Sequence, residues 1–141
     1  MGTDEALGRS RGGFGTKIHI VVDALGYPVD FVLRAGQEAD VTQAEPLIQA
    51  HKAKAYILDK AYESDAVVAA AKGQGAEAVV PSKKNRKVKR DYDKHLYKER
   101  VKVEWFISLI KQYRRVATRY EKTARNFLGF VHVASIMVLL R

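Results

Sequence analysis

The sequence predicts an α/β fold in which a mixed β-sheet is flanked by helices. Residues 16–34 contain two segments of alternating apolar and polar side chains around a turn, which indicates an antiparallel hairpin. Residues 54–80 contain two short apolar segments separated by an alanine-rich helical stretch, which indicates a parallel strand pair. Two further stretches, residues 97–111 and about 123–140, have the periodicity of helices packed on a core.

Length and composition are those of one globular domain. The chain has 141 residues and is 47% hydrophobic, which is enough for one core and too short for two ordinary domains. We expect a flexible lead-in over residues 1–15, which contain five glycines and no period, and a single domain over residues 16–141. The absence of cysteine excludes disulfides and thiolate metal sites and agrees with a cytoplasmic location.

No membrane segment is expected. Residues 1–15 lack the apolar stretch of a signal peptide. The longest apolar run, residues 127–140, has 14 residues and contains His132 and Ser135. Because a membrane-spanning helix needs about 20 apolar residues, we interpret this run as a buried helix of the domain.

Basic charge is concentrated in the second half of the chain. Residues 1–81 contain eight Lys/Arg and eleven Asp/Glu, a net charge of −3, whereas residues 82–141 contain 17 and five, a net charge of +12. This asymmetry suits a polyanionic partner, most simply nucleic acid. The alternative is a basic surface that binds nothing anionic.

The hairpin is predicted by alternation and by its turn residues. The strand expected over residues 16–23 has apolar side chains at every second position, as a half-buried strand should. Gly26 and Pro28 supply the turn, and residues 29–34 form the returning strand.

Two helices are predicted next to the parallel strand pair. The first covers residues 40–51, with Asp40 or Thr42 as a candidate N-cap. The second covers residues 64–72, with Ser64 as its candidate N-cap.

Asp59 directly follows the first strand of the predicted parallel pair. That strand covers residues 54–58, and a right-handed crossover connects it to the second strand, residues 76–80. The carboxyl ends of parallel strands form the edge of an α/β sheet at which active sites gather. Asp59 is therefore a candidate catalytic residue. The alternative is that it caps the following turn.

Residues 82–96 form a basic loop with almost no apolar side chains. Such a composition indicates a loop and not a core element. Six basic residues lie within eight positions: Lys83, Lys84, Arg86, Lys87, Lys89 and Arg90.

The helix expected over residues 97–111 has two chemically different faces. At about 100° per residue, four polar side chains lie within roughly 60° of one another, namely Tyr97, Arg100, Glu104 and Lys111. A broad apolar arc on the other side indicates packing on a core; it contains Val103, Trp105, Phe106, Leu109, Ile110 and Tyr113. For a single glutamate, the alternative is an ordinary solvated face.

The segment order resembles that of bacterial insertion-sequence transposases of the DDE class. The spacing Y-x2-R-x3-E-x6-K from Tyr97 to Lys111 is similar to the family signature around its last acidic residue, and I-L-D-K-A-Y-E-S around Asp59 is similar to the segment of its second one. Further similar segments cover nearly the whole chain in the same order: G-R-S-R-G-G-F-G-T-K-I-H, V-V-D-A-L-G-Y-P, G-Q-E-A-D, P-S-K-K-N-R-K and R-R-V-A-T-R-Y-E-K-T-A-R-N-F.

The resemblance implies a ribonuclease H-like fold and metal-dependent DNA chemistry. In that family three acidic residues hold two divalent ions, and carboxylates are the ligands that Mg²⁺ prefers. The resemblance makes Asp59 the second acidic ligand and Glu104 the third, with Mg²⁺ or Mn²⁺ as cofactor. It implies that Tyr97, Arg100 and Lys111 orient Glu104 and contact DNA phosphates, and that the basic loop clamps the DNA backbone.

The first acidic residue of the family pattern is not found. Asp4 has no strand pattern around it, and Asp23 lies at the hairpin turn. The first strand, central in a ribonuclease H fold, is also not identified, which predicts open sheet edges. We therefore expect a carboxy-terminal part of a transposase, from a split or decayed gene, a two-frame element or a trimmed protein.

The predicted function is that of a transposase catalytic-domain fragment that binds DNA and is inactive in strand cleavage and strand transfer by itself. Its expected partners are the DNA of insertion-sequence ends and targets, the amino-terminal part of the transposase and a second copy of the chain, with a cytoplasmic, nucleoid-associated location. Two alternatives are a non-catalytic basic nucleic-acid-binding module and a decayed remnant. Each of the four histidines is interpreted as structural, because no two have metal-ligand spacing.

Overall fold

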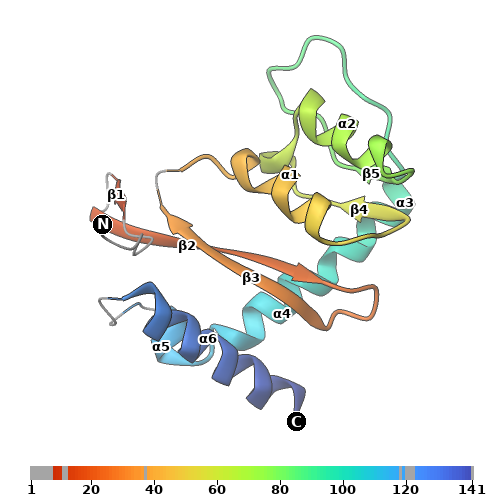
Figure 1. Cartoon of the computed structure of the whole chain (residues 1–141). Coiled ribbons are helices and arrows are strands. Elements are labelled where there is room, and N and C mark those ends of the chain that lie inside the picture. The colour runs from red at the N-terminus through yellow and green to blue at the C-terminus, as the bar shows by residue number, and fades with distance from the viewer. Residues whose placement is uncertain (1–7, 11–12, 37, 118, 120–122, 141) are drawn as a thin grey trace. The chain divides into compact units, whose positions relative to one another are not determined.

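A computed structural model describes residues 8–10, 13–36, 38–117, 119 and 123–140. The chain divides into two compact units, one formed by Met1–Glu38 with Lys102–Arg141 and the other by Ala39–Val101. Figure 1 labels their helices and strands, which together make a mixed α/β chain. Asp4 lies outside the described residues.

The first unit contains a three-stranded antiparallel sheet in the order β1-β2-β3. Its strands are β1 (Gly8–Ser10), β2 (Gly13–Val22) and β3 (Pro28–Ala35). The β2–β3 pair is the predicted hairpin, which is confirmed. In its turn, Asp23 Oδ1 accepts hydrogen bonds from the amides of Leu25 and Tyr27, and Gly26 has a φ of 88°, a conformation that favours glycine.

The predicted lead-in over residues 1–15 is too long at its carboxyl end. Residues 8–10 pair with residues 13–15, from Gly8 opposite Gly15 to Ser10 opposite Gly13. An antiparallel ladder is made by backbone groups, so it forms here without the side-chain alternation from which strands are predicted.

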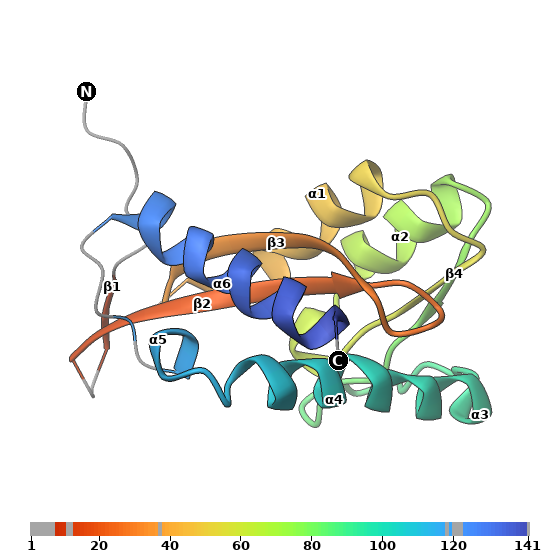
Figure 2. The same ribbon diagram turned by 90° about the horizontal axis from the view of Figure 1, so that it is seen from below.

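Three helices complete the first unit: α4 (Val101–Ile110), α5 (Arg114–Ala117) and α6 (Ala124–Leu139). Thr123 caps α6, since its side chain accepts a hydrogen bond from the Asn126 amide. Figure 2 shows α6 running along the hairpin. One face of the hairpin packs on a core made of Phe106 and Ile110 from α4, Val116 from α5, and Phe127, Val131 and Ala134 from α6.

Two predictions about these helices are wrong in part. Trp105, placed by the helical wheel in the core-facing arc, exposes 68% of its surface. Residues 127–140 were expected to form a buried helix, but α6 buries one stripe and leaves Val133, Ile136 and Met137 exposed. In both helices the side chains that are buried in the core form a narrower stripe than the apolar side chains as a whole.

The second unit contains the parallel pair that the sequence predicts. Strands β4 (Ala55–Ile57) and β5 (Glu77–Val79) pair in parallel, with Tyr56 opposite Ala78. The predicted parallel pairing is confirmed. Around it lie α1 (Val41–Ala50), η1 (Lys60–Tyr62), α2 (Asp65–Gly73), α3 (Lys94–Tyr97) and η2 (Lys98–Arg100).

The N-cap positions of α1 and α2 agree with the sequence, but only one of the two side chains caps its helix. Ser64 caps α2 as predicted, its hydroxyl accepting a hydrogen bond from the Val67 amide at 3.1 Å. Asp40 is the N-cap residue of α1, but its side chain makes no capping hydrogen bond. A small core of Ala44, Ile48 and Val67 holds α1 and α2 together.

No helix in the described part of the chain is long and apolar enough to cross a membrane.

Candidate functional site

Asp59 lies where β4 ends, and its carboxylate is not used to close the following turn. The Leu58 amide still donates to the Val79 carbonyl at 3.0 Å, so the parallel pairing reaches the residue before Asp59. The 3-10 turn after it is closed by the backbone, with the Tyr62 amide donating to the Asp59 carbonyl at 2.9 Å. The Asp59 side chain makes no capping hydrogen bond and is 41% exposed. The capping interpretation of this carboxylate is therefore not supported.

Arg100 forms an ion pair with Asp59. Arg100 Nη2 lies 3.5 Å from Asp59 Oδ2, and both side chains belong to the second unit. The resemblance suggested that Arg100 orients Glu104, but the ion pair places its guanidinium beside the other candidate carboxylate. A partly exposed pair of this kind contributes little to stability, about 0–1 kcal/mol.

Tyr62 is a fourth titratable group beside Asp40, Asp59 and Arg100. Burial, followed by the charges of Asp40 and Asp59, raises the pKa of Tyr62 from 10.0 to about 12, although Arg100 lowers it in part. Burial is the main reason that ionisation of this phenol is disfavoured, and the negative charges of the two carboxylates add to it.

We expect the chain to lose stability in alkali through Tyr62. The folded-state pKa is raised above the unfolded value, so the contribution is fully present below about pH 10 and is lost as the pH rises toward about 12. The measurement is the free energy of unfolding in urea at several pH values from 9 to 12. Tyr62→Phe should weaken this pH dependence, whereas Tyr27→Phe, at an exposed turn position, should keep it. Equal slopes in wild type and Tyr62→Phe would contradict the assignment.

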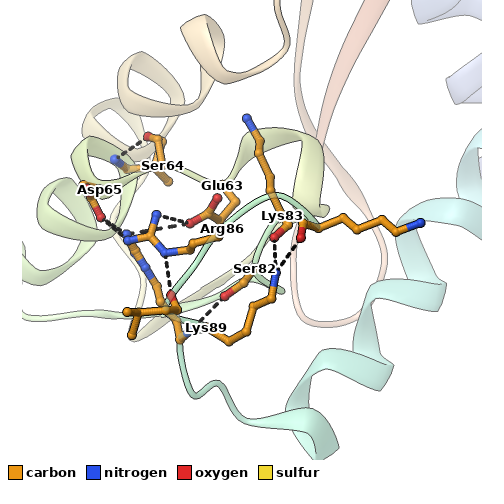
Figure 3. Close-up of polar contacts among 11 residues, drawn as sticks. Glu63, Ser64, Asp65, Ser82, Lys83, Arg86 and Lys89 are labelled. Carbon is orange, nitrogen blue, oxygen red and sulfur yellow. Dashed lines mark hydrogen bonds and ion pairs between the residues drawn. The ribbon is translucent and has the colours of Figure 1, made fainter.

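The basic loop folds around two carboxylates that the sequence analysis did not select. Figure 3 shows Glu63, just before α2, and Asp65, in its first turn, beside the loop arginine Arg86. Arg86 Nη1 lies 3.1 Å from Glu63 Oε1, close enough for an ion pair but without hydrogen-bond alignment. Arg86 Nη2 donates to Asp65 Oδ1 at 2.7 Å, and Arg90 pairs with both carboxylates.

Further hydrogen bonds close the loop on itself. Lys89 Nζ donates to the carbonyls of Lys83 and Lys84 at 2.7 and 2.8 Å, and the Arg90 amide donates to Ser82 Oγ at 2.7 Å. The side chains of Lys84 and Lys87 are exposed. The six predicted DNA-binding residues thus differ in their surroundings, because both arginines are paired with acids and Lys89 is bound to backbone carbonyls.

The remaining signature residues lie on α3 and α4 or directly after α4. Tyr97 is half-buried and meets Tyr92 edge-on, with ring centroids 5.6 Å apart. Glu104 lies in the first turn of α4 and is exposed, and Lys111, just beyond that helix, is exposed as well. Because η2 has about three residues per turn, Tyr97 and Arg100 are nearly aligned along the axis, closer than the ideal α-helical wheel places them.

Asp59 and Glu104 belong to different units. Within the part of the chain that the structure describes, no three His, Cys, Asp or Glu side chains are grouped as a metal site. Asp23, a weak candidate for the first acidic residue, has a carboxylate oxygen bound to two amides of its turn.

The neighbours of the candidate residues that sequence reasoning did not select for the site are Asp40, Tyr62, Glu63 and Asp65. Their signal in the sequence was weak, since three of them lie within the six residues after Asp59, in a segment of mixed polarity. The first half of the chain has an excess of acidic residues and the second half an excess of basic residues. This predicts that the two halves attract each other, but it does not predict which side chains form ion pairs.

The chain belongs to the family described as "Transposase DDE domain", which it matches over residues 4–139. It is 39% identical to a Brucella ovis protein named "Putative transposase for insertion sequence element IS6501", over 89% of this chain and 98% of that protein. It is 29% identical to a Burkholderia cepacia protein named "Putative transposase for insertion sequence element IS402", over 88% of this chain but only 62% of that protein. No solved structure matches the chain.

Family membership confirms the resemblance to insertion-sequence transposases of the DDE class that the sequence motifs indicated. DDE transposases act on DNA and generally use divalent metal ions.

Proposed function

We propose that the chain is the ribonuclease H-like catalytic part of an insertion-sequence transposase, with Asp59 and Glu104 as two of its metal-binding acidic residues. The observation that carries this proposal is the place of Asp59. Its carboxylate follows a parallel strand, is partly exposed and makes no capping hydrogen bond, as a metal ligand at the edge of an α/β sheet requires.

The donor chemistry fits a hard divalent cation. Carboxylate oxygens prefer Mg²⁺ or Mn²⁺, and bound ions of this kind activate the attacking oxygen and neutralise the leaving one in phosphodiester cleavage. Asp59 and Glu104 hold the ions in this proposal, and two ions are expected in the complete active site. Arg100, paired with Asp59, orients that carboxylate and limits its affinity for a cation.

The protein groups around these carboxylates position DNA. Arg100 and Lys111 carry charges that suit phosphate contacts near the cut, and Tyr97 supports the helical segment that bears Arg100. The exposed Lys84 and Lys87 and the other basic residues of the loop hold the DNA backbone without reading its sequence. With DNA as the substrate, a cytoplasmic, nucleoid-associated location follows.

The complete ribonuclease H-like sheet needs another strand in this proposal. β4 has one strand partner in the described chain, and β1 pairs with β2 over three residues only. In this proposal the amino-terminal part of the transposase supplies the further strand and the first acidic residue, and a second copy of the chain is a further expected partner. By itself the chain binds DNA and performs neither strand cleavage nor strand transfer.

Metal binding tests the assignment without depending on activity. In Mn²⁺ titrations followed by electron paramagnetic resonance, we expect weak binding by the wild-type chain and at least about tenfold weaker binding by Asp59→Asn and by Glu104→Gln. Glu45→Gln, at an exposed position of α1, is the matched control and should bind as wild type does. Addition of a peptide that supplies the first strand should tighten binding only where both carboxylates are intact.

A non-catalytic basic module remains the second candidate, favoured by the strongly basic residues 82–141. If Asp59→Asn, Glu104→Gln and Glu45→Gln all bind Mn²⁺ equally while wild type binds DNA in a salt-dependent way, this second candidate is correct. The remaining alternative is a decayed remnant that barely folds. A cooperative thermal transition of the isolated chain would contradict it.

A further inference from the structure

Two arginines of the basic loop converge on a single carboxylate oxygen. Arg86 Nη2 lies 2.7 Å from Asp65 Oδ1, and Arg90 Nη2 contacts the same atom. The Asp65 side chain is 83% exposed, so this oxygen lies at the surface between the two guanidinium groups. A phosphate oxygen is bound by arginines in the same manner.

Glu63 holds the same two arginines from the buried side. Its side chain is 3% exposed, and its Oε1 lies 3.1 Å from Arg86 Nη1 and 3.7 Å from Arg90 Nη2. The two carboxylates therefore differ in their access to solvent. Glu63 is enclosed and keeps the guanidiniums in place, whereas Asp65 can be exchanged for another anion.

The charges of this cluster explain why such an exchange matters. Two guanidiniums and two carboxylates are neutral together, so Arg86 and Arg90 contribute no net charge while both acids are paired with them. When another anion replaces Asp65 on the arginines, the Asp65 carboxylate is still stabilised in the first turn of α2, where a negative charge interacts favourably with the helix dipole.

We propose that Asp65 occupies, in the DNA-free chain, the place of a DNA backbone phosphate on Arg86 and Arg90, and that DNA displaces it. The inference rests on the proposed function, because it assumes that the basic loop contacts DNA. It adds that Asp65 weakens DNA binding, while Glu63 is a positioning residue that keeps the two arginines ready for phosphate.

The test is the affinity for a short duplex of arbitrary sequence, measured by fluorescence anisotropy over a series of NaCl concentrations. We expect Asp65→Asn to bind several-fold more tightly than wild type. Its slope of log K against log salt should be steeper by about 0.9 for each additional phosphate that the variant neutralises.

Asp91→Asn is the matched control. Asp91 is exposed, follows Arg90 directly and has no hydrogen bond or ion pair within the described chain. The Asp91→Asn substitution removes the same charge near the same loop. We therefore expect a smaller gain in DNA affinity than for Asp65→Asn and an unchanged slope of log K against log salt. Circular dichroism melts of both variants should show the wild-type transition, since each residue is exposed.

Arg86→Gln provides the second arm of the experiment. In the double variant with Asp65→Asn, most of the gain in affinity should disappear, because the vacated arginine is what binds the phosphate. Equal effects of Asp65→Asn and Asp91→Asn on affinity and slope would overturn the inference while leaving the proposed function intact. A wild-type chain and an Asp65→Asn variant that both fail to bind DNA would overturn both.

Discussion

Phe106→Ala is expected to destabilise the chain by about 3–5 kcal/mol. Phe106 is buried in the core of the first unit, and its ring centroid lies 6.2 Å from that of Phe31 on β3. Removal of the ring leaves a cavity between α4 and the hairpin that neighbouring side chains refill only in part. Because small domains are stable by about 5–15 kcal/mol, this one change removes a large share of the stability. The measurement is urea unfolding followed by far-ultraviolet circular dichroism.

The adjacent residue is the control for this prediction. Trp105 is the larger side chain and lies one position earlier on α4, but it is 68% exposed. Trp105→Ala should therefore change the free energy of unfolding by no more than about 0.5 kcal/mol. If Trp105→Ala costs as much as Phe106→Ala, the face by which α4 packs on the hairpin has been assigned incorrectly.

Glu63→Ala is expected to cost about 2–3 kcal/mol. The substitution removes the buried partner of Arg86 and Arg90 and leaves two guanidiniums facing the space of a lost carboxylate. Breaking a fully buried ion pair from one side costs about 3–5 kcal/mol, and the partial exposure of both arginines reduces this penalty. Thermal unfolding measures the loss in stability, and limited trypsin digestion should cut the loop of residues 82–93 faster than in wild type.

Glu77→Ala serves as the comparison, because Glu77 has the same side chain in the same unit but is exposed on β5. It should leave the thermal transition and the digestion rate close to those of wild type. Similar behaviour of the Glu63 and Glu77 variants would show that the loop is held by contacts other than the Glu63 ion pairs.

The helices and strands that could be predicted are those in which apolar and polar side chains alternate with a regular period along the sequence. Alternation along residues 16–22 reports which side of a strand is buried, and β2 and β3 formed where it indicated. Ser64 was predictable as a cap because a hydroxyl before a helix bonds an amide three residues later, a contact that needs no distant partner. The position of Asp59 at the end of a parallel strand followed from the same local pattern.

Predictions failed where burial depended on a partner element. A helical wheel assigns Trp105 and Phe106 to one apolar arc, but only Phe106 is buried in the core and Trp105 is exposed. The β1 strand escaped prediction because its ladder is made by the backbone of a glycine-rich segment.

The sequence by itself determined the family, the order of the hairpin, the parallel strand pair and the longer helices, and Asp59 and Glu104 as candidate acidic residues, because motif spacing and periodicity are properties of neighbouring residues. Tertiary structure decided that Asp59 pairs with Arg100, and that Arg86 and Arg90 of the basic loop are held by Glu63 and Asp65. Between 21 and 25 positions separate Asp65 from these two arginines. An ion pair depends on distances of a few ångströms, and over such separations only the folded path of the chain determines which opposite charges meet.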